Sequence, residues 1–267
     1  MYEQGSRDTP GQEMPRDARR ALVTGAAAGI GRATALRLAA DGTAVALVDI
    51  REREVATVAQ EARGRGVDVL EFVADVADEA AMENVFEAVS DAWGGLDAAV
   101  AAAGISMSTT GDARVDQLEL AIWDRVIRTN LTGMFITCKH ATRLVAASGG
   151  GSIVIVGSPT GMYGFAYGEH AYSASKGGCH ALARNMACEL ATLGIRVNVV
   201  VPGFIDTAMN AHVVADAKLL ADTEQLIPLG RIGMPAEIAG MIAWLISPDA
   251  SYATGGYFMV DGGQTCL

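Results

Sequence analysis

Lysine, cysteine and long apolar runs are all scarce in this sequence. Its 267 residues include only three lysines and four cysteines. Lysine and arginine together number 20 against 31 aspartates and glutamates, which gives a net charge of −11. No basic cluster offsets this charge, so nucleic acid is not an expected partner. Although 51% of the residues are hydrophobic, no run approaches the ~18 apolar residues of a membrane span, so a soluble protein without a membrane partner is expected.

The few cysteines also bear on the compartment. Cys138, Cys179, Cys188 and Cys266 show no Cys-x-x-Cys spacing, and the polar N-terminal stretch lacks the apolar core of a signal peptide. A reduced, cytoplasmic setting is therefore expected.

Residues 1–19 are rich in Gly, Pro, Gln and charge without an apolar period, which predicts a mobile tail. Residues 20–267 are expected to form one domain, because every segment there follows one repeating pattern.

That pattern is an alternation of short apolar runs with helical stretches. The runs include RALVT, AVALVD, VLEFVAD and GSIVIVGS, and YFMVDGG closes the series. Strands this continuously apolar are typical of a parallel sheet that is buried on both faces. We therefore predict an α/β fold with a doubly wound, Rossmann-like parallel sheet of about seven strands and helices on both faces. Two long helices, at about 119–147 and 170–193, carry more small and apolar residues than one buried face requires; they are expected to form an oligomer interface or simply to pack on the sheet.

A glycine-rich turn follows the first predicted strand. The stretch ALVTGAAAGIGRATALRLA places Gly25, Gly29 and Gly31 between that strand and the first helix. Glycines there permit a tight turn and let backbone N–H groups approach a pyrophosphate at the helix N-terminus. The spacing is Gly-x-x-x-Gly-x-Gly rather than the commoner Gly-x-Gly-x-x-Gly. In this strand-to-helix context, the turn predicts a nucleotide site.

Carboxylates at the ends of the second and third strands favour NAD as the nucleotide. Asp49 could accept hydrogen bonds from the ribose hydroxyls, whereas its charge would repel the 2′-phosphate of NADP. The alternatives are that Asp49 caps the next helix, or that Arg51 and Arg53 accommodate NADP. Asp75 could meet the adenine amino group or could be an ordinary helix N-cap.

Candidate catalytic groups occur near later strand ends. Tyr172 precedes Lys176 by four residues near the start of a predicted helix, so both share one face. Ser158 follows the run GSIVIVG, fourteen residues before Tyr172. A free tyrosine has a pKa near 10 and is a poor base at pH 7, but a compact ammonium nearby stabilises the phenolate better than the wide fork of an arginine would. His170 and His180, ten residues apart, do not share a ligand face, so no metal site is predicted and both are taken as bystanders.

Together these motifs resemble those of the short-chain dehydrogenase/reductase family. The resemblance runs from Arg20 to the C-terminus. It rests on TGAAAGIG at Thr24–Gly31, Asp49, the pair Asp75–Val76, AAAG at Ala101–Gly104, NLTG at Asn130–Gly133, Ser158, YSASK, PGFIDT at Pro202–Thr207 and the closing DGG.

The resemblance implies a role for each matching residue. Tyr172 would be the general acid/base on the substrate oxygen, which Ser158 would also bind. Lys176 would stabilise the phenolate and bind the nicotinamide ribose, and Asn130 would hold a water that relays protons from Lys176 to solvent. Ile205 and Thr207 would hold the nicotinamide carboxamide. The other implied cofactor contacts are Ile30, Ile50, Val76, Ala102, Ala103, Gly104, Pro202 and Gly203.

Two departures from the family pattern concern local structure. The family usually has Asn-Asn-Ala-Gly where this chain has Ala101–Gly104, which removes amide side chains that brace neighbouring backbone. Ser158 lies between Gly157 and Pro159, where a second serine and a small residue are more usual.

Loop residues Met162, Tyr163, Phe165 and Tyr167 are predicted to wall the substrate pocket. Residues 206–229 are predicted to form a mobile lid that contributes Met209, Val213, Val214, Leu219 and Leu220.

The resulting hypothesis is an NAD(H)-dependent oxidoreductase, expected as a homotetramer, that interconverts a small-molecule secondary alcohol and a ketone. The first alternative is a 3-oxoacyl-thioester reductase acting on an acyl carrier protein or coenzyme A. Carrier-dependent reductases tend to present basic residues on the two long helices, where this chain has Ile136 and Cys188, and they usually prefer NADP. A sugar or polyol dehydrogenase fits an apolar lid less well. A nucleotide-binding protein without catalysis is the alternative from another class.

Overall fold

The computed structural model describes residues 19–108, 110–164 and 169–266. Apart from Arg19, the predicted N-terminal tail lies outside the described residues, as do Phe165 and Tyr167 of the predicted pocket wall.

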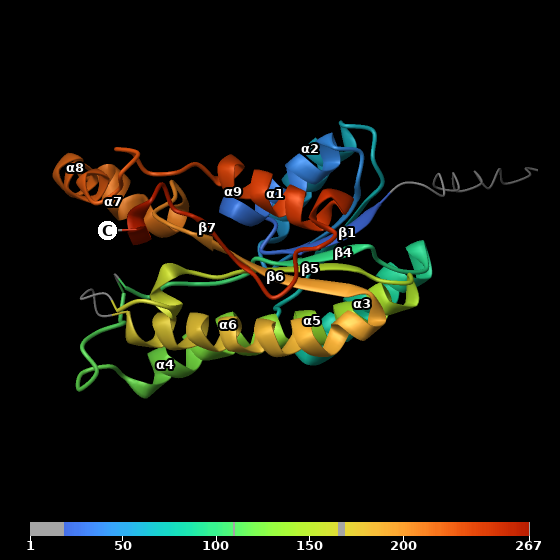
Figure 1. Ribbon diagram of the computed structural model, residues 1–267, viewed down its shortest axis with the longest axis horizontal. Coiled ribbons are helices and arrows are strands. Elements are labelled where there is room, and N and C mark those ends of the chain that lie inside the picture. Colours follow the sequence, from blue (N-terminus) through green and yellow to red (C-terminus); the bar gives the residue numbers. More distant parts are fainter. Residues whose placement is uncertain (1–18, 109, 165–168, 267) are drawn as a thin grey trace, which may run out of the picture.

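A seven-stranded parallel sheet forms the centre of the molecule (Figure 1). Its strands are β1 (Arg20–Thr24), β2 (Ala44–Asp49), β3 (Val69–Val73), β4 (Ala98–Ala101), β5 (Gly151–Val156), β6 (Ile195–Pro202) and β7 (Tyr257–Val260). The order is β3-β2-β1-β4-β5-β6-β7, and every neighbouring pair is parallel. The chain therefore winds outward in both directions from β1 and β4, and crevices at such a switch point are where ligands bind in this architecture. The predicted fold class is confirmed.

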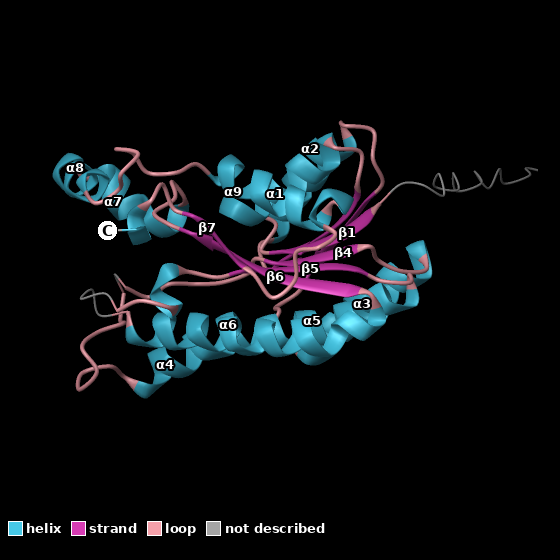
Figure 2. Ribbon diagram, in the orientation of Figure 1, coloured by secondary structure: helices cyan, strands magenta, loops and turns pink. Residues whose placement is uncertain are grey.

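Helices cover both faces of the sheet (Figure 2). On one face lie α1 (Gly29–Ala40), α2 (Glu52–Arg63) and α9 (Pro235–Ile246); on the other lie α3 (Glu79–Trp93), α4 (Leu120–Ile127), α5 (Gly133–Ala147) and α6 (His170–Leu190). Each layer closes its own apolar core, one around Leu36, Val58 and Ile242 and the other around Phe86, Met134 and Ile153. Every residue of β2 is buried. Burial from both sides explains why the strands read as continuous apolar runs.

The first predicted long helix is interrupted by a wider turn. Between α4 and α5 the chain forms a π-helix at Arg128–Thr132, which contains Asn130. Isolated π-turns are frequent at functional sites, because the wider turn redirects side chains and carbonyl groups. The second predicted long helix is α6, extended by a 3₁₀ turn at Ala191–Leu193.

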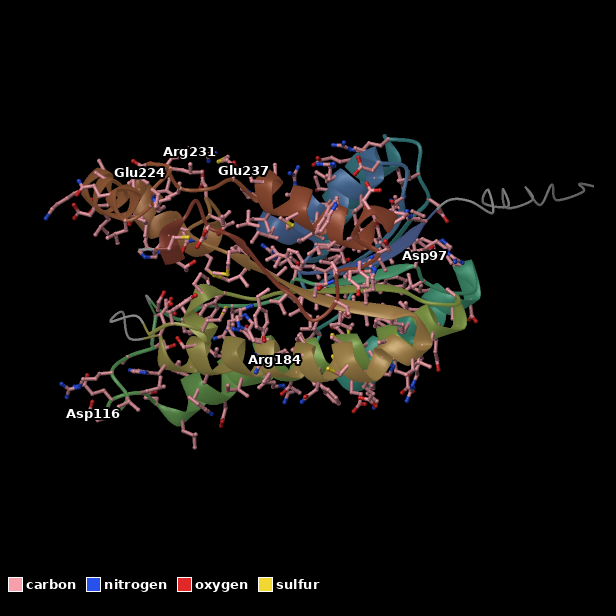
Figure 3. The ribbon with its side chains drawn as sticks, viewed as in Figure 1. Asp97, Asp116, Arg184, Glu224, Arg231 and Glu237 are labelled. Carbon is pink, nitrogen blue, oxygen red and sulfur yellow. The ribbon has the colours of Figure 1, made fainter. Side chains whose placement is uncertain are left out.

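Two short helices follow β6, beyond the carboxyl ends of the strands (Figure 1). After a 3₁₀ turn at Ala208–Asn210 come α7 (Ala211–Ala215) and α8 (Ala217–Gln225). A bidentate ion pair between Arg231 and Glu237, at 2.7 and 2.9 Å, ties the segment after α8 to the start of α9 (Figure 3). Further 3₁₀ turns lie at Pro159–Gly161, Pro248–Ala250 and Gln264–Cys266. Within the described ranges, no helix combines the length and apolar character needed to cross a membrane.

Candidate active site

A cavity of about 960 Å³ opens at the carboxyl ends of the strands, next to the segment that carries α7 and α8. Every residue predicted above to bind the cofactor or take part in catalysis lines this cavity, except Asn130. The structure thus brings together side chains from the loops after six strands, at the edge where a doubly wound sheet binds its ligands.

The glycine-rich turn has the backbone geometry that its sequence predicts. Gly25 and Gly29 have φ angles of 68° and 52°, which favour glycine. A Cβ added to Gly31 would lie 2.1 Å from the carbonyl oxygen of Gly25, so the turn leaves no room for a side chain there. Within the described ranges, no side chain caps the N-terminus of α1. Its first N–H groups are therefore available to a bound anion, and this arrangement fits the pyrophosphate of a dinucleotide.

Asp49 ends β2 as a buried carboxylate that is already engaged by its neighbours. Its Oδ2 accepts from the backbone N–H of Ala27 at 3.0 Å. Its Oδ1 accepts from the backbone N–H of Arg51 at 3.0 Å and from Arg51 Nε at 3.1 Å. The hydrogen bond to Asp49 raises the pKa of Arg51. Asp49 thus lies at the cavity with an arginine bound to it.

Asp75 is not the N-cap of the helix that follows it. Its Oδ1 accepts from the backbone N–H of Ala77 at 2.9 Å, whereas the N-cap of α3 is Asp78, which accepts from Ala81 N–H. The helix-cap alternative for Asp75 is therefore wrong. Its carboxylate lines the cavity, beside Val76.

Thr24 braces the backbone where the usual amide side chains are missing. Its Oγ1 accepts from the N–H groups of Ala102 at 3.2 Å and Ala103 at 3.3 Å. The next part of the loop is held by Asn130, whose Oδ1 accepts from Ile105 N–H at 2.8 Å and whose Nδ2 donates to Ile105 C=O at 2.9 Å. Two polar side chains thus anchor the segment after β4 despite its alanines.

Asn130 acts behind the cavity wall rather than on it. The side chain is buried in the π-turn, and Nδ2 also lies 3.2 Å from Ser175 Oγ on α6. Asn130 therefore links the loop after β4 to the helix that carries Tyr172 and Lys176. Its part in a proton relay stays a prediction.

Tyr172 and Lys176 occupy the first two turns of α6. The Lys176 side chain is buried, and its Nζ donates to the carbonyl oxygen of Val156 at 2.8 Å. The same Nζ lies 5.5 Å from the centroid of the Tyr172 ring. Asp112 fixes the start of this helix, because its carboxylate accepts from the N–H groups of His170 at 3.0 Å and Tyr172 at 3.2 Å. Sequence reasoning missed Asp112, since it lies about 60 residues before the helix that it caps.

Ser158 lies just beyond the end of β5. Its Oγ accepts from Thr160 N–H at 3.3 Å and lies 3.0 Å from Thr160 Oγ1. Thr160 also lines the cavity and so places a second hydroxyl beside the first. The only sequence signal for it is its position two residues after Ser158.

The far end of the cavity is walled by the segment after β6 and by the approach to α6. Met209, Val213 and Leu219 line it, whereas Val214 and Leu220 do not. On the other side lies Glu169, whose pKa is raised by burial and next by the charge of Asp112. Glu169 was also missed from the sequence.

The described half of the predicted pocket wall, Met162 and Tyr163, does not lie where it was expected, whereas Phe165 and Tyr167 lie outside the described residues. Met162 and Tyr163 are 41% and 48% exposed and do not line the cavity. Met162 and Tyr163 follow directly after the 3₁₀ turn Pro159–Gly161, and the chain there turns away from the cavity.

Comparisons with known proteins agree with this geometry. The family model described as enoyl-(acyl carrier protein) reductase matches residues 25–265. The cis-4-hydroxycyclohexanecarboxylate dehydrogenase of Sinomonas cyclohexanicum is 41% identical over 247 residues, which cover 92% of this chain and 96% of that protein. A 3-oxoacyl-[acyl-carrier-protein] reductase of Thermotoga maritima is 39% identical over 242 residues, covering 91% and 96%. The crystal structure of levodione reductase matches with a TM-score of 0.88 and 33% identity, covering 93% of this chain and 98% of that one.

The fold and the cavity are those of a dinucleotide-binding oxidoreductase. The match extends over nearly all of the described residues, and the chain belongs to the short-chain dehydrogenase/reductase family, whose members act on CH–OH groups with a nicotinamide cofactor.

Proposed function

We propose that this protein is an NAD(H)-dependent oxidoreductase that interconverts a secondary alcohol and a ketone. The observation that carries the proposal is a single cavity that holds Tyr172, Lys176 and Ser158 together with the glycine turn and Asp49. A bound nicotinamide ring would take up or supply the hydride. The chain itself must then bind the substrate oxygen and move its proton.

The side chains present are suited to those two tasks. Ser158 and Tyr172 both present hydroxyl groups to the cavity, and Ser158 Oγ donates to the substrate oxygen while Tyr172 exchanges the proton with it. The buried ammonium of Lys176 stabilises negative charge on Tyr172, because it lies close to the ring with few competing solvent contacts. Asn130 holds the loop after β4 against α6, which keeps the cofactor and the proton donor in register.

Replacing Tyr172 tests this proposal directly. Tyr172→Phe keeps the ring but removes the hydroxyl, so kcat for alcohol oxidation should fall by about 10²- to 10⁴-fold while NAD still binds. Turnover is followed at the nicotinamide absorbance, and cofactor binding by calorimetry. A variant with wild-type kcat would refute the proposed function.

The preference for NAD over NADP is proposed on the charge at the adenosine end of the cavity. The Asp49 carboxylate is buried there and would face a 2′-phosphate. Arg51 does not offset this repulsion fully, because its guanidinium already binds Asp49.

The substrate is proposed to be a small alcohol or ketone with an apolar body. Met209, Val213 and Leu219 supply apolar surface at the far end of the cavity. Glu169 adds a polar side chain to the same wall. The Sinomonas relative, by its name, acts on a hydroxylated cyclohexane ring, which fits such a cavity.

A 3-oxoacyl thioester is the second candidate, favoured by the Thermotoga relative. The absence of a basic residue at position 136 does not argue against it, because Ile136 is buried and cannot report on a docking surface. A parallel screen of cyclic alcohols, ketones and 3-oxoacyl thioesters with NAD(H) and NADP(H) distinguishes the two. Turnover of thioesters alone would select the second.

We also propose a homotetramer in the cytoplasm. Leu120, Trp123 and Phe135 are 72%, 36% and 47% exposed on α4 and α5. These apolar side chains support the predicted oligomer interface, and sedimentation equilibrium that shows a monomer would exclude it.

A further inference from the structure

A buried histidine lies directly behind the loop that carries Ser158. His180 of α6 is 2% exposed, and its Nε2 accepts from the backbone N–H of Ser158 at 3.4 Å. The sequence suggested only a bystander at this position. The hydrogen bond instead connects the catalytic helix to the residue that would bind the substrate oxygen.

Gly157 is what allows this approach. A Cβ at position 157 would lie 2.3 Å from His180 Nε2 and 3.0 Å from His180 Cδ2. The imidazole therefore occupies the space that any side chain at position 157 would fill. The glycine that departs from the family pattern and the histidine form one complementary pair.

Other contacts hold the imidazole in place from the opposite side. The ring of Tyr257, on β7, lies 5.0 Å from the His180 ring, and Tyr257 Oη donates to the backbone carbonyl of His180 at 2.9 Å. Arg184, one turn further along α6 beneath the sheet (Figure 3), donates in turn to Tyr257 Oη. The histidine side chain thus has little freedom to rotate away from Ser158.

The tautomer follows from the surroundings. Burial, and next the charges of Lys176 and Arg184, lower the pKa of His180 to about 4, so the ring is neutral at pH 7. Nε2 accepts a hydrogen bond, which puts the proton on Nδ1. Among the described residues, Nδ1 has no hydrogen-bond partner. Within the described part of the chain, the hydrogen bond from Ser158 N–H is therefore the polar contact that orients the ring.

Lys176 and His180 are one helical turn apart and hold two points of the same short segment. Lys176 Nζ donates to Val156 C=O at 2.8 Å, and His180 Nε2 accepts from Ser158 N–H. We propose that His180 is a positioning residue, which fixes the Ser158 hydroxyl relative to Tyr172 on the same helix. The kinetic test of this inference rests on the proposed function, whereas its structural test does not.

The kinetic test is a double-mutant cycle. His180→Leu should lower kcat about 10-fold through displacement of Ser158, with the Kd for NAD unchanged. His180→Gln, which can place an acceptor near the Nε2 position, should recover kcat to within about 3-fold of wild type. In a Ser158→Ala background, His180→Leu should change kcat by less than about 2-fold, because the hydroxyl that it positions is gone. Additive losses, or a Gln variant as impaired as Leu, would overturn the inference.

His140 provides a matched control. It is a second buried histidine, stacked on Phe86 in the layer of α3 and α5, and one of its ring nitrogens has no hydrogen-bond partner among the residues that the structure describes. His140→Leu should leave kcat within about 2-fold of wild type and show no coupling to Ser158→Ala. An equal kcat loss there would mean that His180 acts only through general stability.

Two measurements decide the matter without turnover. Hydrogen–deuterium exchange of the segment 156–160 should be faster in His180→Leu than in wild type or His140→Leu. In the wild-type protein, ¹⁵N-histidine NMR should show His180 protonated at Nδ1 and not at Nε2. Unchanged exchange or the opposite tautomer would overturn the inference. Wild-type kcat in Tyr172→Phe would instead overturn the proposed function alone.

Discussion

Gly161 should be among the least replaceable residues near the active site. It ends the 3₁₀ turn after Ser158 and packs on the backbone of α6. A Cβ added to Gly161 would lie 2.7 Å from the carbonyl carbon of Lys176 and 2.8 Å from Gly177 N. Ordinary contact begins near 3.4 Å, so Gly161→Ala must separate the turn from the helix by roughly 0.7 Å.

This displacement should be expensive in both stability and rate. Overpacking of this kind costs about 1–3 kcal/mol of unfolding free energy. Because the contact lies between the loop of Ser158 and the helix of Lys176, the shift also separates groups that must act together. A misplacement approaching 1 Å can cost up to ~100-fold in rate, so we expect kcat to fall at least about 10-fold.

Gly177 offers the matched control on the other side of the same contact. A Cβ there would lie 3.5 Å from Gly161 O, which is an ordinary contact distance. Gly177→Ala should therefore raise stability by about 0.5–1 kcal/mol, since alanine favours the helix interior, and should leave kcat unchanged. Urea unfolding and steady-state kinetics measure both effects. Wild-type stability and kcat in Gly161→Ala, or equal damage in the two variants, would refute the reasoning.

Two further predictions concern the cofactor and pH. Asp49→Asn should weaken NAD about 10-fold, the equivalent of about 1.4 kcal/mol for one charge-assisted hydrogen bond, and should strengthen NADP binding. Adding Arg51→Ala should abolish the NADP gain, and calorimetry that shows no change for either cofactor would exclude this role of Asp49. The pKa of His180 is lowered from 6.5 to about 4 in the folded protein. As the pH falls, the His180 side chain therefore binds a proton in the unfolded chain before it does so in the folded protein. The contribution of His180 to the free energy of unfolding is thus fully present above about pH 6.5 and is lost toward pH 4. The unfolding free energies of wild type and His180→Gln, measured by urea titration, should therefore converge as the pH falls.

Most of the fold and part of the candidate site could be predicted from local patterns in the sequence. The strands of the sheet read as apolar runs because both of their faces are covered, and Gly25, Gly29 and Gly31 mark a turn whose geometry admits little else. Tyr172 and Lys176 could be paired from spacing alone, since residues four apart share a helix face.

Contacts between segments that are far apart in the sequence could not be predicted from local patterns. Asp112 caps α6 from a loop about 60 residues earlier, and nothing near Asp112 in the sequence indicates which helix it would meet. Met162 and Tyr163 were expected in the pocket wall because they are large loop side chains near a strand end, but the direction of a loop after a strand is set by its turn. The 3₁₀ turn carries both side chains outward. Thr24 could replace the missing amides only because β1 lies beside β4 in the sheet.

The loop of Ser158 is held by α6 at three successive points. Lys176 binds Val156 C=O, His180 binds Ser158 N–H, and the backbone at Gly177 closes on Gly161. Tyr172 belongs to the same helix, so its position relative to Ser158 depends on one rigid element and its contacts with β5. The segment of α7 and α8 contributes to none of these three contacts. Replacing its side chains should therefore change which alcohol fits the cavity and leave the geometry of proton transfer intact.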